Sequence, residues 1–199
     1  MNAFKNIKDF YTYSSFVEKE TERINSNESE NTEGDLRFDY KEYSQLNLKR
    51  MQRWDKTYKP SEEIINRLNN INQKQIWWVI TELWCGDSAQ ILPIIAKIAN
   101  ATDKIDLRII LRDDNLEIMD QYLTNGGRSI PKLIAVDTES NKELFTWGPR
   151  PKDAQDLVDT IKKDPSKTQE DMINALYAWY PKDKGMSTER EIAVLLNNK

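Results

Sequence analysis

The chain has 199 residues and a mass of 23.4 kDa, which is typical of one domain and large enough for a hydrophobic core without disulfides or a structural metal. It contains no histidine and one cysteine, Cys85, which excludes histidine-based catalysis, histidine-ligated metals, intramolecular disulfides and multi-cysteine clusters. The formal charge is −4. Eight of the acids and four of the bases fall in residues 1–36, so the remainder is neutral and lacks the basic surface that nucleic acids require.

The apolar residues are not arranged as a membrane protein would need. They make up 38% of the chain, and no apolar run approaches the length of a membrane-spanning helix. The first residues lack the apolar stretch and the small-residue cleavage site of a secretory signal. We therefore expect a cytoplasmic protein that binds neither membranes nor nucleic acid.

Residues 1–60 are predicted to form an N-terminal helical extension. Apolar residues recur at helical spacing over 7–24 and 38–57, which predicts two amphipathic helices. The stretch 25–36 between them is polar and acidic, and this composition is typical of a loop. A third helix is predicted to follow and to end near Asn70, with glutamates in its first turn.

Strands and helices alternate over residues 61–164, which we predict to be the central domain. The predicted strands lie at 76–83, 105–111, 132–137 and 143–147, and the predicted helices lie at 88–101, 116–125 and 151–163. This order predicts an α/β fold with a parallel pair of strands joined by helices, then an antiparallel hairpin and a closing helix. Residues 165–199 are predicted to form a C-terminal helical extension, with helical patterns at 166–182 and 187–197.

The only cysteine lies in the segment Trp84-Cys85-Gly86-Asp87-Ser88, at the end of the first predicted strand and the start of a helix. A sulfur at a helix N-terminus lies among unpaired N–H groups and the positive end of the helix dipole, which favour the thiolate. Pro93 follows eight residues after the cysteine. This arrangement predicts a nucleophilic thiol that caps the helix and is exposed.

The segment resembles the Trp-Cys-Gly-Pro-Cys motif of the thioredoxin superfamily, including the helix proline at the same offset. Downstream, Arg128-Ser129-Ile130-Pro131 is similar to the cis-proline loop of that family, and Trp147-Gly148-Pro149 is similar to its glycine turn. The resemblance covers about residues 61–164. It implies a thioredoxin-like mixed sheet flanked by helices, here with extra N-terminal and C-terminal helices.

The resemblance also implies a site. Cys85 would be the nucleophile, and the Ile130–Pro131 bond would be cis, which places the Ile130 backbone where an extended substrate could pair with it. No cofactor and no metal are implied. The substrate surface would comprise Trp84, Gly86, Asp87, Ile130, Pro131 and Gly148.

The sequence departs from the family pattern at two positions. Ser88 replaces the second cysteine, which makes this a monothiol C-x-x-S type that cannot resolve a mixed disulfide internally. The family's buried acid falls on Val79. Glu82 and Asp87 are nearby carboxylates that would raise the pKa of Cys85, in opposition to the helix dipole. Asp87 is equally an acid that stabilises a first helical turn, and Ser88 either hydrogen-bonds the thiolate or has no task.

Two functions from different classes fit these residues. The first is a thiol-disulfide oxidoreductase in which Cys85 and Ser88 act on a protein disulfide or a low-molecular-weight thiol substrate, with an external thiol as the resolving partner. The alternative is a redox-inactive module that binds a peptide or protein, so the sequence leaves open whether the chain is an enzyme. A thiol peroxidase would need a threonine three residues before the cysteine, and Thr81 lies four before it. The apolar faces of the added helices are buried on the core, on each other, or on a second copy in a homodimer.

Overall fold

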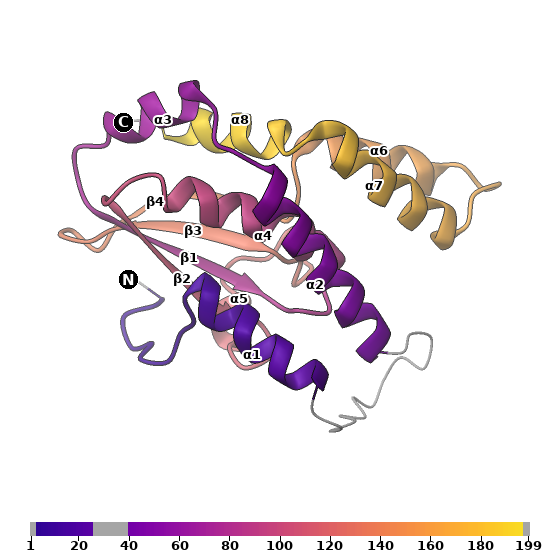
Figure 1. Cartoon of the computed structure of the whole chain (residues 1–199), viewed down its shortest axis with the longest axis horizontal. Helices are drawn as coiled ribbons and strands as arrows, with labels where there is room; N and C mark the ends of the chain where they lie inside the picture. The colour runs from indigo at the N-terminus through magenta and orange to yellow at the C-terminus, as the bar shows by residue number, and fades with distance from the viewer. Residues whose placement is uncertain (1–2, 26–39, 197–199) are drawn as a thin grey trace.

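The fold is described by a computed structural model, which covers residues 3–25 and 40–196 (Figure 1). Within these residues a four-stranded sheet has the order β2-β1-β3-β4. β1 runs parallel to β2 and antiparallel to β3, and β3 pairs antiparallel with β4. The mixed sheet with flanking helices confirms the predicted α/β class. The strands are β1 (Gln75–Thr81), β2 (Ile105–Leu111), β3 (Lys132–Asp137) and β4 (Glu143–Trp147).

Helices precede, connect and follow the strands in the predicted order. Their bounds are α1 (Tyr13–Asn25), α2 (Tyr40–Thr57), α3 (Glu62–Asn69), α4 (Gly86–Ala99), α5 (Leu116–Met119), α6 (Lys152–Lys163), α7 (Gln169–Asp183) and α8 (Met186–Leu195). Figure 1 shows α6 and α7 as an antiparallel pair that extends past the end of the sheet. The loop predicted at 25–36 lies outside the described residues, apart from its first position.

Three predicted boundaries are wrong, each for a local reason. The first helix begins at Tyr13 instead of residue 7 because Tyr11 is extended and exchanges two backbone hydrogen bonds with Ile109, both 2.8 Å long. The predicted helix over 116–125 ends at Met119, since a tight turn closed by Thr124 and Gly127 follows it. The first strand ends at residue 81, two residues early, because a turn follows in which the Cys85 N–H donates to the Glu82 carbonyl at 3.2 Å.

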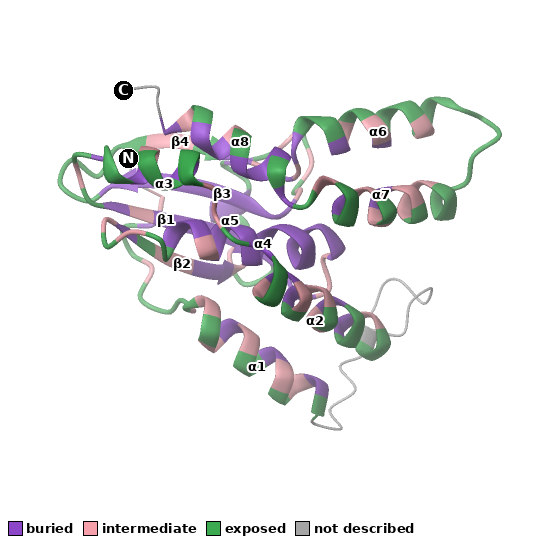
Figure 2. Cartoon of the chain, turned by 45° about the horizontal axis from the view of Figure 1, so that its top comes forward, coloured by how far each residue is buried: buried purple, intermediate pink, exposed green. Residues whose placement is uncertain are grey.

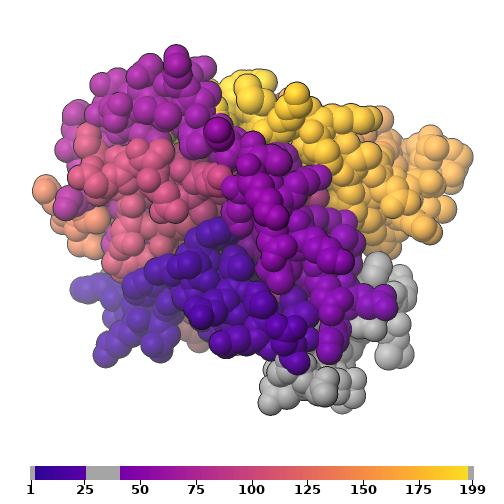
Figure 3. Space-filling view, in the orientation of Figure 1, coloured from indigo at the N-terminus to yellow at the C-terminus, as the bar shows by residue number. Residues whose placement is uncertain are grey.

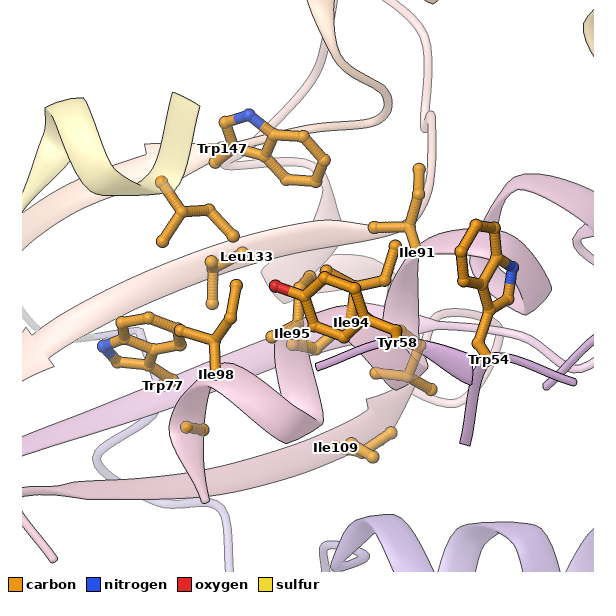
Figure 4. Close-up of a cluster of buried hydrophobic side chains, with 14 of the residues drawn as sticks. Trp54, Tyr58, Trp77, Ile91, Ile94, Ile95, Ile98, Ile109, Leu133 and Trp147 are labelled. Carbon is orange, nitrogen blue, oxygen red and sulfur yellow. The ribbon is translucent and has the colours of Figure 1, made fainter. Parts of the chain in front are cut away.

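The larger core lies on the face of the sheet that α4 covers. Trp77, Ile109 and Leu133 point from three strands toward Ile91 and Ile95 of α4 (Figure 4). Helix α4 is buried over nearly its whole length, and Figure 2 shows it as the most enclosed helix. Because α4 is held on all sides, the residues at its start are fixed relative to the sheet.

The opposite face of the sheet has a thinner cover. Trp78, Ile80 and Ile134 pack there against the short helix α5 and the N-terminal Phe4, whose ring stacks on Trp78 at 4.9 Å between centroids. The two tryptophans of β1 are thus both core residues, but they belong to different layers.

The added helices bury their apolar faces within the chain. Helix α2 packs along α4, where the Trp54 indole N–H donates to Gln90 at 2.7 Å. Helix α8 packs on α3 and α4, and Glu189 accepts hydrogen bonds from the Tyr58 hydroxyl and the Ser61 amide. In the described part of the chain, no helix is both long enough and apolar enough to cross a bilayer.

Candidate functional site

Cys85 is the N-cap residue of α4, as predicted. Its sulfur accepts the Ser88 backbone N–H at 3.5 Å, and its thiol donates to the carbonyl oxygen of Ile130 at 3.3 Å. The residue is half-buried rather than exposed, because Ile130 and the buried residues beside it crowd one side of the sulfur. The thiol therefore lies at a helix start and against the loop that precedes β3.

The two downstream motifs meet at that loop. The Ile130–Pro131 bond is cis, which confirms the prediction, and the Gly148–Pro149 bond is cis as well. Gly148 has a φ of +110°, and a Cβ at this position would collide with the carbonyl oxygen of Pro131. Only glycine allows this close approach of the two backbones. Cys85, Ile130, Pro131 and Gly148 thus form one continuous strip.

Trp84 directly precedes Cys85 and packs against the same cluster of buried residues. It is half-buried, and the Arg112 guanidinium lies 4.6 Å from the centre of its ring. Arg112 also binds Asp113 at 2.7 Å, so its charge is already paired. The Trp84 and Arg112 pair forms a flat, partly exposed wall next to the strip.

Asp87 points away from that wall and is buried. Its carboxylate accepts the Tyr180 hydroxyl at 2.7 Å and forms an ion pair with Arg150, whose Nε lies 3.0 Å away. Gln155 accepts a further hydrogen bond from Arg150 at 3.0 Å. The carboxylate therefore ties α7 and the loop after β4 to the start of α4, a larger role than stabilising one helical turn.

Gly86 is covered by side chains of the added helices. A Cβ at this position would overlap the Tyr177 hydroxyl of α7, and it would lie 2.7 Å from the Tyr43 hydroxyl of α2. These two hydroxyls contact each other, and the Arg50 guanidinium lies 3.8 Å from the centre of the Tyr177 ring. Figure 3 shows α2 running across the front of the molecule between the N-terminal segment and the C-terminal helices. One side of the motif is thus closed by the chain itself.

The environment of Cys85 favours the neutral thiol. Burial, and next the charge of Asp87, raise its pKa to about 11, whereas hydrogen bonds from Ser88 and the Asp87 backbone lower it. The sequence indicates that nearby acids raise the pKa of Cys85 and that the helix terminus lowers it. In the structure, burial has the largest effect on this pKa and raises it. Glu82 contributes differently from the prediction: its carboxylate accepts the Asp113 N–H at 2.8 Å, and burial raises its own pKa to about 7.

The structure thus groups the predicted site residues into two sets. Cys85, Trp84, Ile130, Pro131 and Gly148 adjoin one another; Cys85, Trp84 and Gly148 are half-buried, and Ile130 and Pro131 are buried. Gly86 and Asp87 face the closed side, so their predicted contact with substrate stays a prediction. Ser88 is buried behind the sulfur, where its Oγ accepts a hydrogen bond from the hydroxyl of Thr81 at 2.7 Å.

Sequence reasoning missed the residues that close and support the site. Tyr43, Arg150, Tyr177 and Tyr180 come from segments 40 or more residues away from Cys85, and no spacing rule connects them to it. Arg150 could have been predicted to lie near the motif, because it directly follows the Trp147-Gly148-Pro149 turn in the sequence. Among residues 3–25 and 40–196, no group of three or more potential ligands could hold a metal ion.

A family model described as thioredoxin matches residues 35–163. Two solved structures are similar over nearly the whole chain. A protein of unknown function from Pseudomonas aeruginosa has a TM-score of 0.61 and 18% identity, covering 94% of this chain and 92% of that one. An HIV epitope-scaffold has a TM-score of 0.60 and 16% identity, covering 96% and 94%. At these identities the likeness shows a shared fold alone. No curated protein matches significantly.

Proposed function

The chain belongs to the thioredoxin family, and we propose that it exchanges disulfides through a single thiol, that of Cys85. The observation that carries the proposal is the position of the sulfur. It caps α4, accepts the Ser88 N–H, and lies 3.3 Å from the Ile130 carbonyl at the edge where an extended substrate could pair. The C-x-x-S spacing makes the route monothiol.

The proposed reaction has two exchange steps. Cys85 loses its proton to solvent, and its thiolate attacks one sulfur of a substrate disulfide, so that a mixed disulfide forms and the other substrate sulfur leaves as a thiolate. An external thiol then attacks the mixed disulfide, takes the substrate sulfur and releases Cys85. One thiol and one disulfide are consumed and one of each is formed. This chemistry suits a reducing compartment such as the cytoplasm.

The closed side of the motif restricts how a substrate approaches. Tyr43 and Tyr177 cover Gly86, whereas Trp84, Cys85 and Gly148 are half-buried beside the buried Ile130 and Pro131. A protein disulfide or a low-molecular-weight disulfide would therefore enter from the Trp84 side and lie along Ile130. The added helices would make the site selective among substrates, because they block approach to Cys85 from the Gly86 side.

A second function is consistent with the burial of Cys85, which together with the Asp87 charge raises the pKa of the thiol to about 11. At neutral pH only a small fraction of this thiol is ionised, which suits a module that binds a peptide along Ile130 without chemistry. The two proposals use the same surface and differ only in whether the sulfur reacts.

The deciding experiment is turnover of a peptide mixed disulfide with glutathione as the external thiol. We expect measurable exchange by the parent protein and none by Cys85→Ser. Ser88→Cys serves as the gain variant, because its new thiol lies one helical turn from Cys85 and can resolve the adduct internally. Peptide binding without exchange in both the parent and Ser88→Cys would reject the enzyme and support the binding module.

A further inference from the structure

A pair of buried hydroxyls lies directly behind the Cys85 sulfur. Thr81, the last residue of β1, is fully buried, and Ser88 in the first turn of α4 is 3% exposed. The Thr81 hydroxyl donates to the Ser88 Oγ at 2.7 Å. A strand end and a helix start are thereby joined by one hydrogen bond inside the protein, where no solvent competes for it.

This bond limits what the Ser88 hydroxyl can do. A hydroxyl has one hydrogen, and because its oxygen already accepts from Thr81, that hydrogen is left to be donated elsewhere. The Cys85 sulfur lies beside it, because the Ser88 backbone N–H donates to that sulfur at 3.5 Å, and the Ser88 side chain lowers the pKa of the thiol. A hydroxyl that accepts a hydrogen bond is also polarised into a stronger donor.

We propose that Thr81 is a positioning residue for Cys85: it holds the Ser88 hydroxyl so that its hydrogen points at the sulfur and stabilises the thiolate. The inference rests on the exchange reaction proposed above and adds a residue to it. Thr81 touches neither the sulfur nor a substrate in this account, and its effect passes entirely through Ser88.

The effect of the Ser88 hydroxyl on the thiolate matters because other groups around the sulfur oppose ionisation of the thiol. Burial and the Asp87 carboxylate both disfavour the thiolate, and Arg150 and Tyr180 both donate hydrogen bonds to that carboxylate. The Ile130 carbonyl accepts the thiol hydrogen and offers nothing to a thiolate. Among the neighbours that lower the pKa of the thiol, the Ser88 side chain has the largest effect.

The test measures the alkylation rate of Cys85 by iodoacetamide as a function of pH, in the full chain. Thr81→Val keeps the shape of the side chain but removes the hydroxyl donor. Because a weaker hydrogen bond to the thiolate lowers the thiolate fraction, we expect alkylation about threefold slower at a fixed pH below the thiol pKa. Thr81→Ser retains the hydroxyl and should restore the parent rate. In a Ser88→Ala background, Thr81→Val should have no further effect, because the connecting hydroxyl is gone.

Two results would overturn the inference. One is an unchanged alkylation profile in Thr81→Val, and the other is equal slowing by Thr81→Val with and without Ser88, which would indicate a packing effect. Thr81→Ala also lacks the hydroxyl and replaces the valine variant if that variant does not fold. Alkylation needs no disulfide, so a parent that alkylates as described but never exchanges would refute the proposed function and leave the Thr81 result intact.

Discussion

Asp87 and Glu82 are both buried acids within a few residues of Cys85, yet their surroundings differ. Asp87 faces α7 and has a cation, Arg150, and a hydroxyl, Tyr180, on its two oxygens. Glu82 faces the loop after β2, where the Asp113 backbone N–H donates to it and the Asp113 carboxylate adds a like charge. Burying a carboxylate is costly unless the fold supplies it with a cation or hydrogen-bond donors.

These different surroundings determine which segments are attached to the start of α4. On the Asp87 side, charge pairing fastens two added segments to the start of α4, and that side is closed. On the Glu82 side, the acid is about half protonated at neutral pH and joins the end of β1 to the loop after β2 through one backbone N–H, and Trp84 stays half-buried.

The largest expected effect comes from Asp87→Asn. The substitution leaves Arg150, whose side chain is 20% exposed, without its carboxylate, and we expect the free energy of unfolding to fall by about 2–4 kcal/mol. Urea denaturation measures it. The matched control is Asp120→Asn, which removes a carboxylate from the exposed Arg128 pair and should change stability little. Equal losses in both variants would contradict the account of the closed side.

Glu82→Gln should change how stability depends on pH. Burial raises the pKa of folded Glu82 from 4.5 to about 7, so between these values the native protein holds a proton that the unfolded chain has released. This group's contribution is therefore fully present in acid and is lost as the pH rises, by about 3 kcal/mol in all. Glutamine can still accept the Asp113 N–H. We expect the variant to be more stable than the parent at about pH 8 and to match it near pH 4.

The raised pKa of Cys85 predicts slow alkylation. With a pKa near 11 instead of 9.0, the thiolate fraction at neutral pH is about 100-fold below that of an ordinary cysteine. Iodoacetamide labelling of the native chain should be slower by that factor than labelling in urea. Asp87→Asn should label faster than the parent, since one negative charge has left the site. Native labelling as fast as in urea would show an exposed, ordinary thiol.

The smallest effect concerns the cover over Gly86. Tyr177→Phe removes the hydroxyl that contacts Tyr43 but keeps the ring that Arg50 stacks on. We expect a loss of about 1 kcal/mol in the free energy of unfolding, typical of one partly buried hydrogen bond. Tyr43→Phe should cause a similar loss, and the double variant should lose less than the sum of the two. Additive losses would show that the two hydroxyls act independently.

Local patterns in the sequence predicted much of the fold. Strands 105–111, 132–137 and 143–147 are found with the predicted bounds, because each is a short β-rich run between turn residues. The cis bond at Pro131 was found through a family motif. Helix ends were harder: α5 stops at Met119 because a tight turn follows it, which apolar spacing does not reveal.

The candidate site was only half predictable. Cys85, Ile130 and Gly148 lie in recognisable segments, and the chain brings them together. The ionisation of the thiol depends on burial, and the partners of Asp87 depend on where α7 packs, which are long-range properties that no local spacing encodes. In the sequence, Thr81 lies one residue away from the position of a peroxidase threonine, whereas in the structure its hydrogen-bond partner is Ser88, seven residues further along the chain.

The central claim is that the Cys85 sulfur of the folded protein can form and release a mixed disulfide. It is tested most directly by intact-mass measurement of the native, reduced chain after incubation with glutathione disulfide, and again after excess glutathione is added. The account predicts one glutathione adduct on the parent, none on Cys85→Ser, and loss of the adduct when the thiol is added. An adduct that forms in urea but never on the folded protein would contradict it.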